Sequence, residues 1–290
     1  MREVLAGGLR FKVVTMGASG PVLALVHGLV LDNHSSFYLT LAPALARRAR
    51  LVLYDLRGHG RSEQPPTGYT LDDMASDLFG VLDALGLREP AILLGHSYGG
   101  QVALRAASRR PGRVRGLVLV ESHSGEAELG ARMAETLALE GEARREKVKE
   151  LFGHWLAKHQ ARGHVDPAVA AAQGALDADG QASLRQLARL ERRRRSPMVA
   201  TAEALRDRTT LARDLAATAP LEDRELARIA CPALAVYGAD SEILADGRRL
   251  AGLLPDCRLV EVEGCGHGLL YQATERLREE ILGWLEQVAP

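Results

Sequence analysis

Short, continuous apolar runs recur along this 290-residue chain, and they limit the folds that it can adopt. Each run ends at a glycine or at a polar residue and is followed by a segment of helical or turn character. Unbroken apolar runs, rather than alternating ones, are typical of strands that are buried on both faces of a parallel sheet. The runs cover residues 21–26, 50–54, 91–94, 116–120, 232–238 and 258–262. The sequence therefore predicts an α/β fold with a mostly parallel central sheet and helices on both faces.

Two segments carry clear helical periodicity. The first predicts a helix over 71–87, with Thr70 and Asp73 at its start and Gly86 at its end. The second predicts a final amphipathic helix from Thr274. Both lie beside predicted strands, as helices that cover a sheet should.

The stretch 122–228 differs from the rest of the chain. It is rich in Arg and Ala, has helical composition and shows almost no strand signal. We therefore predict a core domain formed by 1–121 and 229–290, and a helical cap inserted at 122–228.

Composition narrows the expected partners. Lys plus Arg (37) balances Asp plus Glu (37), so no net charge attracts nucleic acid or an anionic membrane. No apolar run is long enough for membrane insertion, and the N-terminus lacks the apolar core of a signal peptide, which predicts a cytoplasmic protein. Three cysteines are too few for a disulfide framework or a zinc site. We expect a small-molecule partner, no metal and no cofactor; the oligomeric state is not indicated.

The segment Gly95-His96-Ser97-Tyr98-Gly99 combines a serine with flanking glycines. A serine hydroxyl is a weak nucleophile that needs a nearby base and open access to its substrate. The Gly-x-Ser-x-Gly pattern supplies that access when it lies on a sharp turn between a buried strand and a helix. The apolar run 91–94 precedes it and a segment rich in small residues follows. This context predicts that Ser97 is a nucleophile.

A tetrahedral intermediate places negative charge on oxygen, and preorganised N–H donors must meet that charge. One predicted donor is the backbone N–H of Tyr98, directly after the nucleophile. The second is the N–H of Leu29, which follows His27-Gly28 at the end of an earlier strand. We expect His27 to hold this loop by a hydrogen bond rather than to transfer a proton.

Taken together, these motifs resemble the α/β-hydrolase superfamily. The resemblance rests on His27-Gly28, the segment from Tyr54 to Ser62, Gly95-His96-Ser97-Tyr98-Gly99-Gly100 and Gly264-Cys265-Gly266-His267-Gly268. It implies a Ser, acid, His order of catalytic residues along the chain. His267, between glycines after the last predicted strand, is the expected general base and acid.

The sequence leaves more than one candidate for the acid that orients His267. In the commonest pattern of the superfamily it is an Asp three positions after the glycine that ends the penultimate strand, and Ser241 occupies that position here. Asp240 and Glu242 stand on either side of it. A variant of the pattern places the acid after the strand that follows the nucleophile helix, where this chain has Glu121. We favour Glu121 and retain Asp240 and Glu242 as alternatives.

These features predict a serine hydrolase that cleaves an ester, lactone or thioester through an acyl-enzyme on Ser97. The predicted cap has few aromatic residues, chiefly Phe152 and Trp155, so a bulky or extended acyl group, free or bound to a carrier, is expected rather than a flat ring. Three alternatives stay open: an acyltransferase or cyclase that uses the same acyl-enzyme, a carbon–carbon bond hydrolase, and, least favoured, a receptor-like protein without catalysis.

Overall fold

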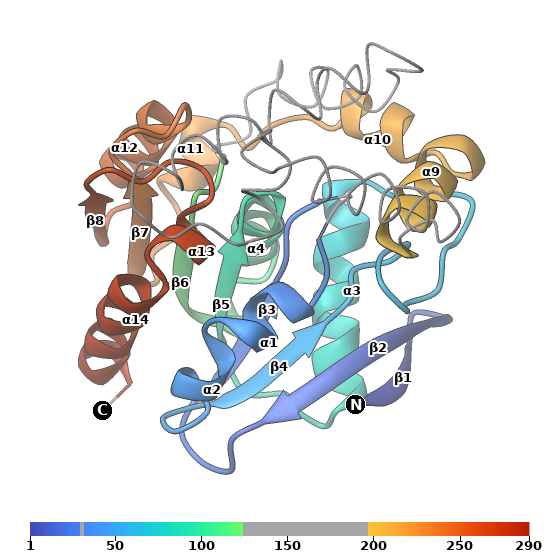
Figure 1. The fold of residues 1–290 in the computed structure, drawn as a ribbon, viewed down its shortest axis with the longest axis horizontal. Helices are drawn as coiled ribbons and strands as arrows, with labels where there is room; N and C mark the ends of the chain where they lie inside the picture. Colours follow the sequence, from blue (N-terminus) through green and yellow to red (C-terminus); the bar gives the residue numbers. More distant parts are fainter. Residues whose placement is uncertain (30–31, 124–196, 290) are drawn as a thin grey trace, which may run out of the picture.

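A single eight-stranded sheet runs through the computed structural model, which describes residues 1–29, 32–123 and 197–289 (Figure 1). The strand order is β1-β2-β4-β3-β5-β6-β7-β8, and all pairs from β4 to β8 are parallel. The strands are β1 (Arg2–Ala6), β2 (Leu9–Met16), β3 (Val22–Val26), β4 (Arg50–Tyr54), β5 (Ala91–His96), β6 (Val114–Val120), β7 (Ala233–Gly238) and β8 (Cys257–Val262). The predicted parallel sheet is confirmed.

The first two strands form a hairpin that was not predicted from the sequence. β1 pairs antiparallel with β2, and β2 pairs antiparallel with β4. Gly7 and Gly8 connect the two strands with φ of 56° and 82°, which is the left-handed backbone that a two-residue hairpin turn requires. The Gly-Gly pair between two short segments was the available signal.

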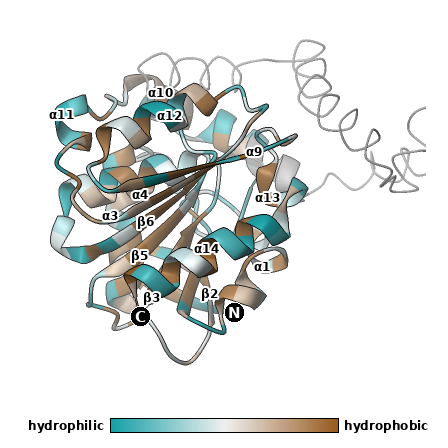
Figure 2. Cartoon of the chain, turned by 90° about the vertical axis from the view of Figure 1, so that its left-hand side faces the viewer, coloured by the Kyte–Doolittle hydropathy of each residue, from teal (hydrophilic) through white to brown (hydrophobic). Residues whose placement is uncertain are grey.

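Helices cover both faces of the sheet (Figures 1 and 2). On one face α3 (Leu71–Ala84), α4 (Tyr98–Arg109) and α12 (Leu244–Leu253) share an apolar cluster with the strands. On the other face lie α1 (Ser35–Leu39), α2 (Ala42–Leu45), α13 (Leu269–Gln272) and α14 (Thr274–Val288).

Successive residues of a central strand enter opposite clusters. In β3, Leu23 and Leu25 pack on the α14 side, whereas Val22, Ala24 and Val26 pack on the α3 side. A strand that is buried on both faces must be apolar at every position, which explains the continuous runs in the sequence.

The two predicted helices are present. α3 begins after Thr70, whose side chain accepts from the Asp73 N–H while the Asp73 side chain accepts from the Thr70 N–H. Gly86, with φ of 77°, follows the helix end. α14 begins at Thr274, as predicted, and buries Leu277, Ile281 and Leu285.

Part of the predicted cap lies outside the described residues, including Phe152 and Trp155. The part that the structure describes is helical and contains α9 (Pro197–Arg208), α10 (Leu211–Ala217) and α11 (Asp223–Leu226). Leu205, Leu211 and Leu215 join the same apolar cluster as α3 and α4. The cap boundaries at 122–228 therefore stay a prediction.

Among the helices in the described ranges, none has both the length and the apolar character needed to cross a membrane.

Replacing Thr70 by Ala removes the side chain that caps α3. We expect the free energy of unfolding to fall by about 1 kcal/mol, because one helical N–H loses its partner. Urea unfolding of Thr70→Ala, compared with Thr67→Ala at a nearby exposed position, measures the difference. Equal stability of the two variants would contradict a capping role.

Candidate active site

The candidate site lies at the carboxyl ends of the parallel strands. Loops that follow β3, β5, β6, β7 and β8 carry Gly28, Ser97, Glu121, Ser241 and His267, respectively. Because parallel strands end at the same edge of a sheet, residues that are far apart in sequence meet there.

Ser97 occupies a strained turn between β5 and α4. Its φ and ψ are 53° and −119°, a conformation that side-chain-bearing residues rarely adopt. The Ser97 N–H donates to the Val120 carbonyl at 3.0 Å, which ties the turn to β6. A Cβ on Gly99 would lie 1.9 Å from the Val26 carbonyl oxygen, and a Cβ on Gly95 would lie 2.4 Å from the Gly100 nitrogen. The glycines are therefore required by close approach of backbone to backbone.

His267 bridges Ser97 and Glu121. Its Nε2 lies 3.2 Å from the Ser97 Oγ, and its Nδ1 lies 3.2 Å from the Glu121 Oε2. A carboxylate accepts only, so Nδ1 carries the proton and Nε2 faces the serine as an acceptor. The three side chains form a continuous hydrogen-bonded chain although they are separated in sequence by 24 and 146 residues.

Glu121 is fully buried directly after β6, with φ of 50°. Its Oε1 accepts from the Gly238 N–H at 2.5 Å, and its Oε2 accepts from the Ser241 hydroxyl at 2.5 Å. Asp240 and Glu242 are exposed on the loop after β7. Of the three carboxylates considered in the sequence, Glu121 is therefore the one that hydrogen-bonds to His267.

Two further histidines flank His267. The His96 ring lies 5.7 Å from the His267 ring and the His123 ring lies 6.1 Å from it, measured between centroids. Each flanking ring has its own carboxylate: His96 Nδ1 lies 3.7 Å from Asp32, and His123 Nδ1 lies 3.3 Å from Asp246.

These surroundings set the acidity of His267. Its side chain is 48% exposed, so one edge is open to the site. The adjoining protein nevertheless desolvates the ring and lowers the pKa of His267 below its usual value. The Glu121 hydrogen bond acts in the opposite direction, whereas charge on His96 and His123 adds to the lowering. The result favours the neutral, proton-accepting form of His267.

The loop after β3 lies against the nucleophile. A Cβ on Gly28 would stand 3.6 Å from the Ser97 Cβ and 3.1 Å from the Asp32 carboxylate. The Gly28 N–H donates to Asp32 at 2.8 Å, so Leu29 is the next residue that can offer an N–H to a substrate oxygen. Tyr98 is the first residue of α4, where a helix leaves its N–H groups without partners inside the helix. Leu29 and Tyr98 thus stand on the two segments that meet beside Ser97.

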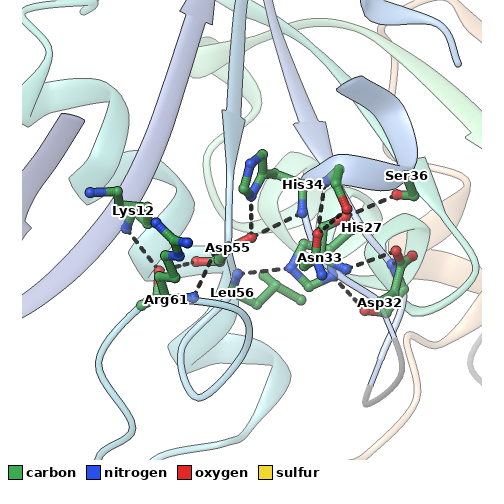
Figure 3. Close-up of polar contacts among 12 residues, drawn as sticks. Lys12, His27, Asp32, Asn33, His34, Ser36, Asp55, Leu56 and Arg61 are labelled. Atoms are coloured by element: carbon green, nitrogen blue, oxygen red, sulfur yellow. Dashed lines mark hydrogen bonds and ion pairs between the residues drawn. The ribbon is translucent and has the colours of Figure 1, made fainter. Parts of the chain in front are cut away.

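A buried polar network holds this loop (Figure 3). His27 is fully buried; its Nε2 accepts from the Leu56 N–H at 3.0 Å, and its Nδ1 lies 2.6 Å from the Gly28 carbonyl. Nδ1 therefore carries the proton and donates to that carbonyl, which agrees with the expected structural role of His27. Asp55 continues the network by accepting from the His34 N–H and the Arg61 N–H, both at 2.9 Å.

Several site residues were missed at the level of sequence. Asp32, His123 and Asp246 carried no motif, because each acquires its partner only through the fold. Ser241 was recognised only as a departure from the common pattern, and its contact with Glu121 could not be anticipated. The position of His123, two residues after Glu121 at the end of a predicted strand, was the one local signal.

Comparison with known proteins agrees with this architecture. A family model described as alpha/beta hydrolase fold matches residues 21–274. The polyketide synthase ThaQ from Burkholderia thailandensis is 30% identical over 98% of this chain, and the chain spans 12% of the length of that synthase. A non-heme chloroperoxidase from Streptomyces lividans is 29% identical over 88% of this chain and 86% of its own length.

Among solved structures, the esterase RhEst1 from Rhodococcus sp. ECU1013 superposes with a TM-score of 0.70 and 25% identity, covering 99% of this chain and 98% of the esterase. The family model covers most of the chain, and the sheet order and the sharp serine turn are those expected of it. The chain belongs to the α/β-hydrolase fold family.

Proposed function

We propose that this protein is a serine hydrolase that cleaves an ester, lactone or thioester through an acyl-enzyme on Ser97. The observation that carries the proposal is the hydrogen-bonded chain from Ser97 Oγ through His267 to Glu121, with 3.2 Å at both contacts. A serine with a base in reach, and a base oriented by a carboxylate, is the arrangement that activates a hydroxyl for nucleophilic attack.

In the first half-reaction, His267 Nε2 takes the Ser97 proton as Oγ attacks the acyl carbon. The N–H groups of Tyr98 and Leu29 receive the negative charge on the former carbonyl oxygen. Glu121 accepts the Nδ1–H of His267 throughout and stabilises the imidazolium while it exists. The intermediate collapses, His267 gives its proton to the leaving alcohol or thiol, and the acyl group stays on Oγ.

In the second half-reaction, a water molecule replaces the leaving group. His267 Nε2 removes a proton from the water as its oxygen attacks the acyl carbon, and the same two N–H groups receive the charge. When the intermediate collapses, the proton returns to Ser97 Oγ and the carboxylic acid is released. Both proton abstractions, from Ser97 and from water, start from the neutral form of His267, which the lowered pKa of this residue favours.

The substrate in this proposal is a small molecule with a bulky or extended acyl group. The likeness to a segment of a polyketide synthase supports including thioesters, and the likeness to an esterase supports including esters. A panel of short and long p-nitrophenyl esters, acyl thioesters and lactones tests the class. Turnover that rises with acyl length is expected; fast turnover of acetate esters alone would contradict this choice of substrate.

A fluorophosphonate probe should label the native protein covalently at Ser97. Ser97→Ala should abolish labelling and lower kcat on the order of 10⁶-fold, because the nucleophile itself is lost. Ser122→Ala, which removes a neighbouring buried hydroxyl, is the matched control and should still be labelled. Absence of labelling in the native protein would overturn the proposal.

Glu121→Ala should lower kcat on the order of 10⁴-fold, because His267 loses the carboxylate that fixes its tautomer and orientation. Asp240→Ala and Glu242→Ala should retain kcat near that of the native protein. Circular dichroism of each variant controls for folding. Loss of activity in Asp240→Ala or Glu242→Ala, with normal activity in Glu121→Ala, would move the acid to the loop after β7.

The lowered pKa of His267 predicts where activity falls at low pH. The base works only when it is neutral, so kcat/KM should decline as pH falls through a midpoint below about 6.5. Glu121→Gln removes an interaction that raises the pKa, so the remaining activity of this variant should decline at still lower pH. A native midpoint above 7, or an upward shift in Glu121→Gln, would show that the electrostatic account of His267 is wrong.

A further inference from the structure

Ser241 touches the proposed acid of the triad from the loop after β7. The Ser241 N–H donates to the Gly238 carbonyl at 3.0 Å, which forms a tight turn directly after the strand. The turn directs the half-buried side chain toward β6, where its Oγ lies 2.5 Å from the Glu121 Oε2. Ser241 thus occupies the position that commonly carries the acid, and it contacts Glu121, the carboxylate proposed to act as the acid here.

The direction of this hydrogen bond follows from its neighbours. An ionised carboxylate can only accept, so the Ser241 hydroxyl donates to Glu121. The same Oγ accepts from the Ile243 N–H at 3.3 Å, which uses one of its lone pairs. The hydroxyl hydrogen is therefore directed at Oε2, the oxygen that also accepts from His267 Nδ1 at 3.2 Å.

The Glu121 carboxylate is held at both of its oxygens. The Gly238 N–H fixes Oε1, and Ser241 fixes Oε2 on the side that faces His267. Without the Ser241 bond, only one contact from the β7 side would restrain rotation of the carboxylate about its last side-chain bond. His267 is half exposed, so its ring orientation depends strongly on this carboxylate.

We propose that Ser241 is a positioning residue whose hydroxyl holds the Glu121 Oε2 against His267 Nδ1, so that His267 Nε2 faces Ser97. The proposal rests on the serine hydrolase function proposed above. A carboxylate at position 241 beside buried Glu121 would place two like charges at one site, and one of them would have to take up a proton. A hydroxyl avoids this repulsion and adds a donor.

Ser241→Ala tests the role through kcat. We expect kcat to fall about tenfold, in line with the loss of one hydrogen bond to a charged group, while KM changes little. Ser241→Thr keeps the hydroxyl and should retain most of the activity. Ser122→Ala is the matched control, because its hydroxyl is buried nearby and donates to the Gly95 carbonyl at 3.3 Å rather than to Glu121. Native kcat in Ser241→Ala, or equal losses in the Ala and Thr variants, would overturn the proposal.

The pH profile separates positioning from a purely structural role. Without Ser241, the Glu121 Oε2 is held less firmly against His267 Nδ1, so the hydrogen bond that raises the pKa of His267 weakens. The acidic limb of kcat/KM should therefore move to lower pH in Ser241→Ala and stay in place in Ser241→Thr and Ser122→Ala. A limb in Ser241→Ala that stays in place or moves to higher pH would contradict the proposed contact.

A reciprocal exchange gives a test that does not depend on the Ala variant. Glu121→Gln should lose most of its activity. Adding Ser241→Asp returns a carboxylate beside His267, and the introduced amide can donate to it, which reverses the native donor and acceptor. We expect the double variant to exceed Glu121→Gln at least tenfold in kcat. If activity does not recover, a side chain at position 241 cannot reach the place that the Glu121 Oε2 occupies in the native protein, and this result would contradict the proposal.

The outcomes distinguish this inference from the function on which it rests. If Ser97→Ala retains native activity, the serine hydrolase function is wrong and the role of Ser241 falls with it. If Ser97→Ala and Glu121→Ala are inactive while Ser241→Ala matches the native protein in kcat and in its acidic limb, only the positioning role is wrong.

Discussion

The rest of the site depends on the hydrogen bonds of the buried Glu121 carboxylate. An ionised carboxylate that is removed from water is costly unless hydrogen bonds replace its hydration. Here the three replacements come from two segments: the Gly238 N–H and the Ser241 hydroxyl from the end of β7 and the loop after it, and the His267 ring from the loop after β8. The same contacts that make the charge tolerable also fix the loops after β6, β7 and β8 relative to one another. In the proposed mechanism, the hydrogen bonds that stabilise these loops therefore also orient His267, the base.

Two adjacent strand ends store strain at this edge of the sheet. Ser97 and Glu121 both have positive φ, at 53° and 50°, and they are the only non-glycine residues with that conformation in the described ranges. Such strain costs on the order of 1–3 kcal/mol per residue and persists only where the surroundings fix it. The surroundings here are the paired strands β5 and β6, the Ser97 N–H bond to Val120 and the Glu121 N–H bond to Val236. The sheet thus holds the Ser97 and Glu121 side chains at its carboxyl edge, in the positions that the proposed chemistry requires.

Much of the fold was predictable because its signals are local. Continuous apolar strands, the Thr70 cap and the serine turn each lie within a few residues of sequence, and the structure agrees with all of them. The β1–β2 hairpin was missed because both strands mix exposed and buried residues, so neither forms the continuous apolar run that marks the central strands. The site was predictable only in part. Ser97 and His267 carry glycine-flanked motifs, whereas the choice between Glu121 and Asp240 depends on how β6 and β7 align. The pairs His96–Asp32 and His123–Asp246 span 64 and 123 residues and leave no local pattern.

In the proposed mechanism, Ser97, activated by His267 and Glu121, carries the acyl group during turnover. Rapid quenching of the protein with a chromogenic long-chain ester, followed by peptide mass spectrometry, tests it most directly. We expect a burst of chromophore to coincide with a mass increase of one acyl group on the peptide that contains Ser97, and the adduct to disappear as product forms. A burst with the acyl group on another residue, or turnover without any acylated peptide under conditions that trap such adducts, would show that Ser97 does not carry the acyl group.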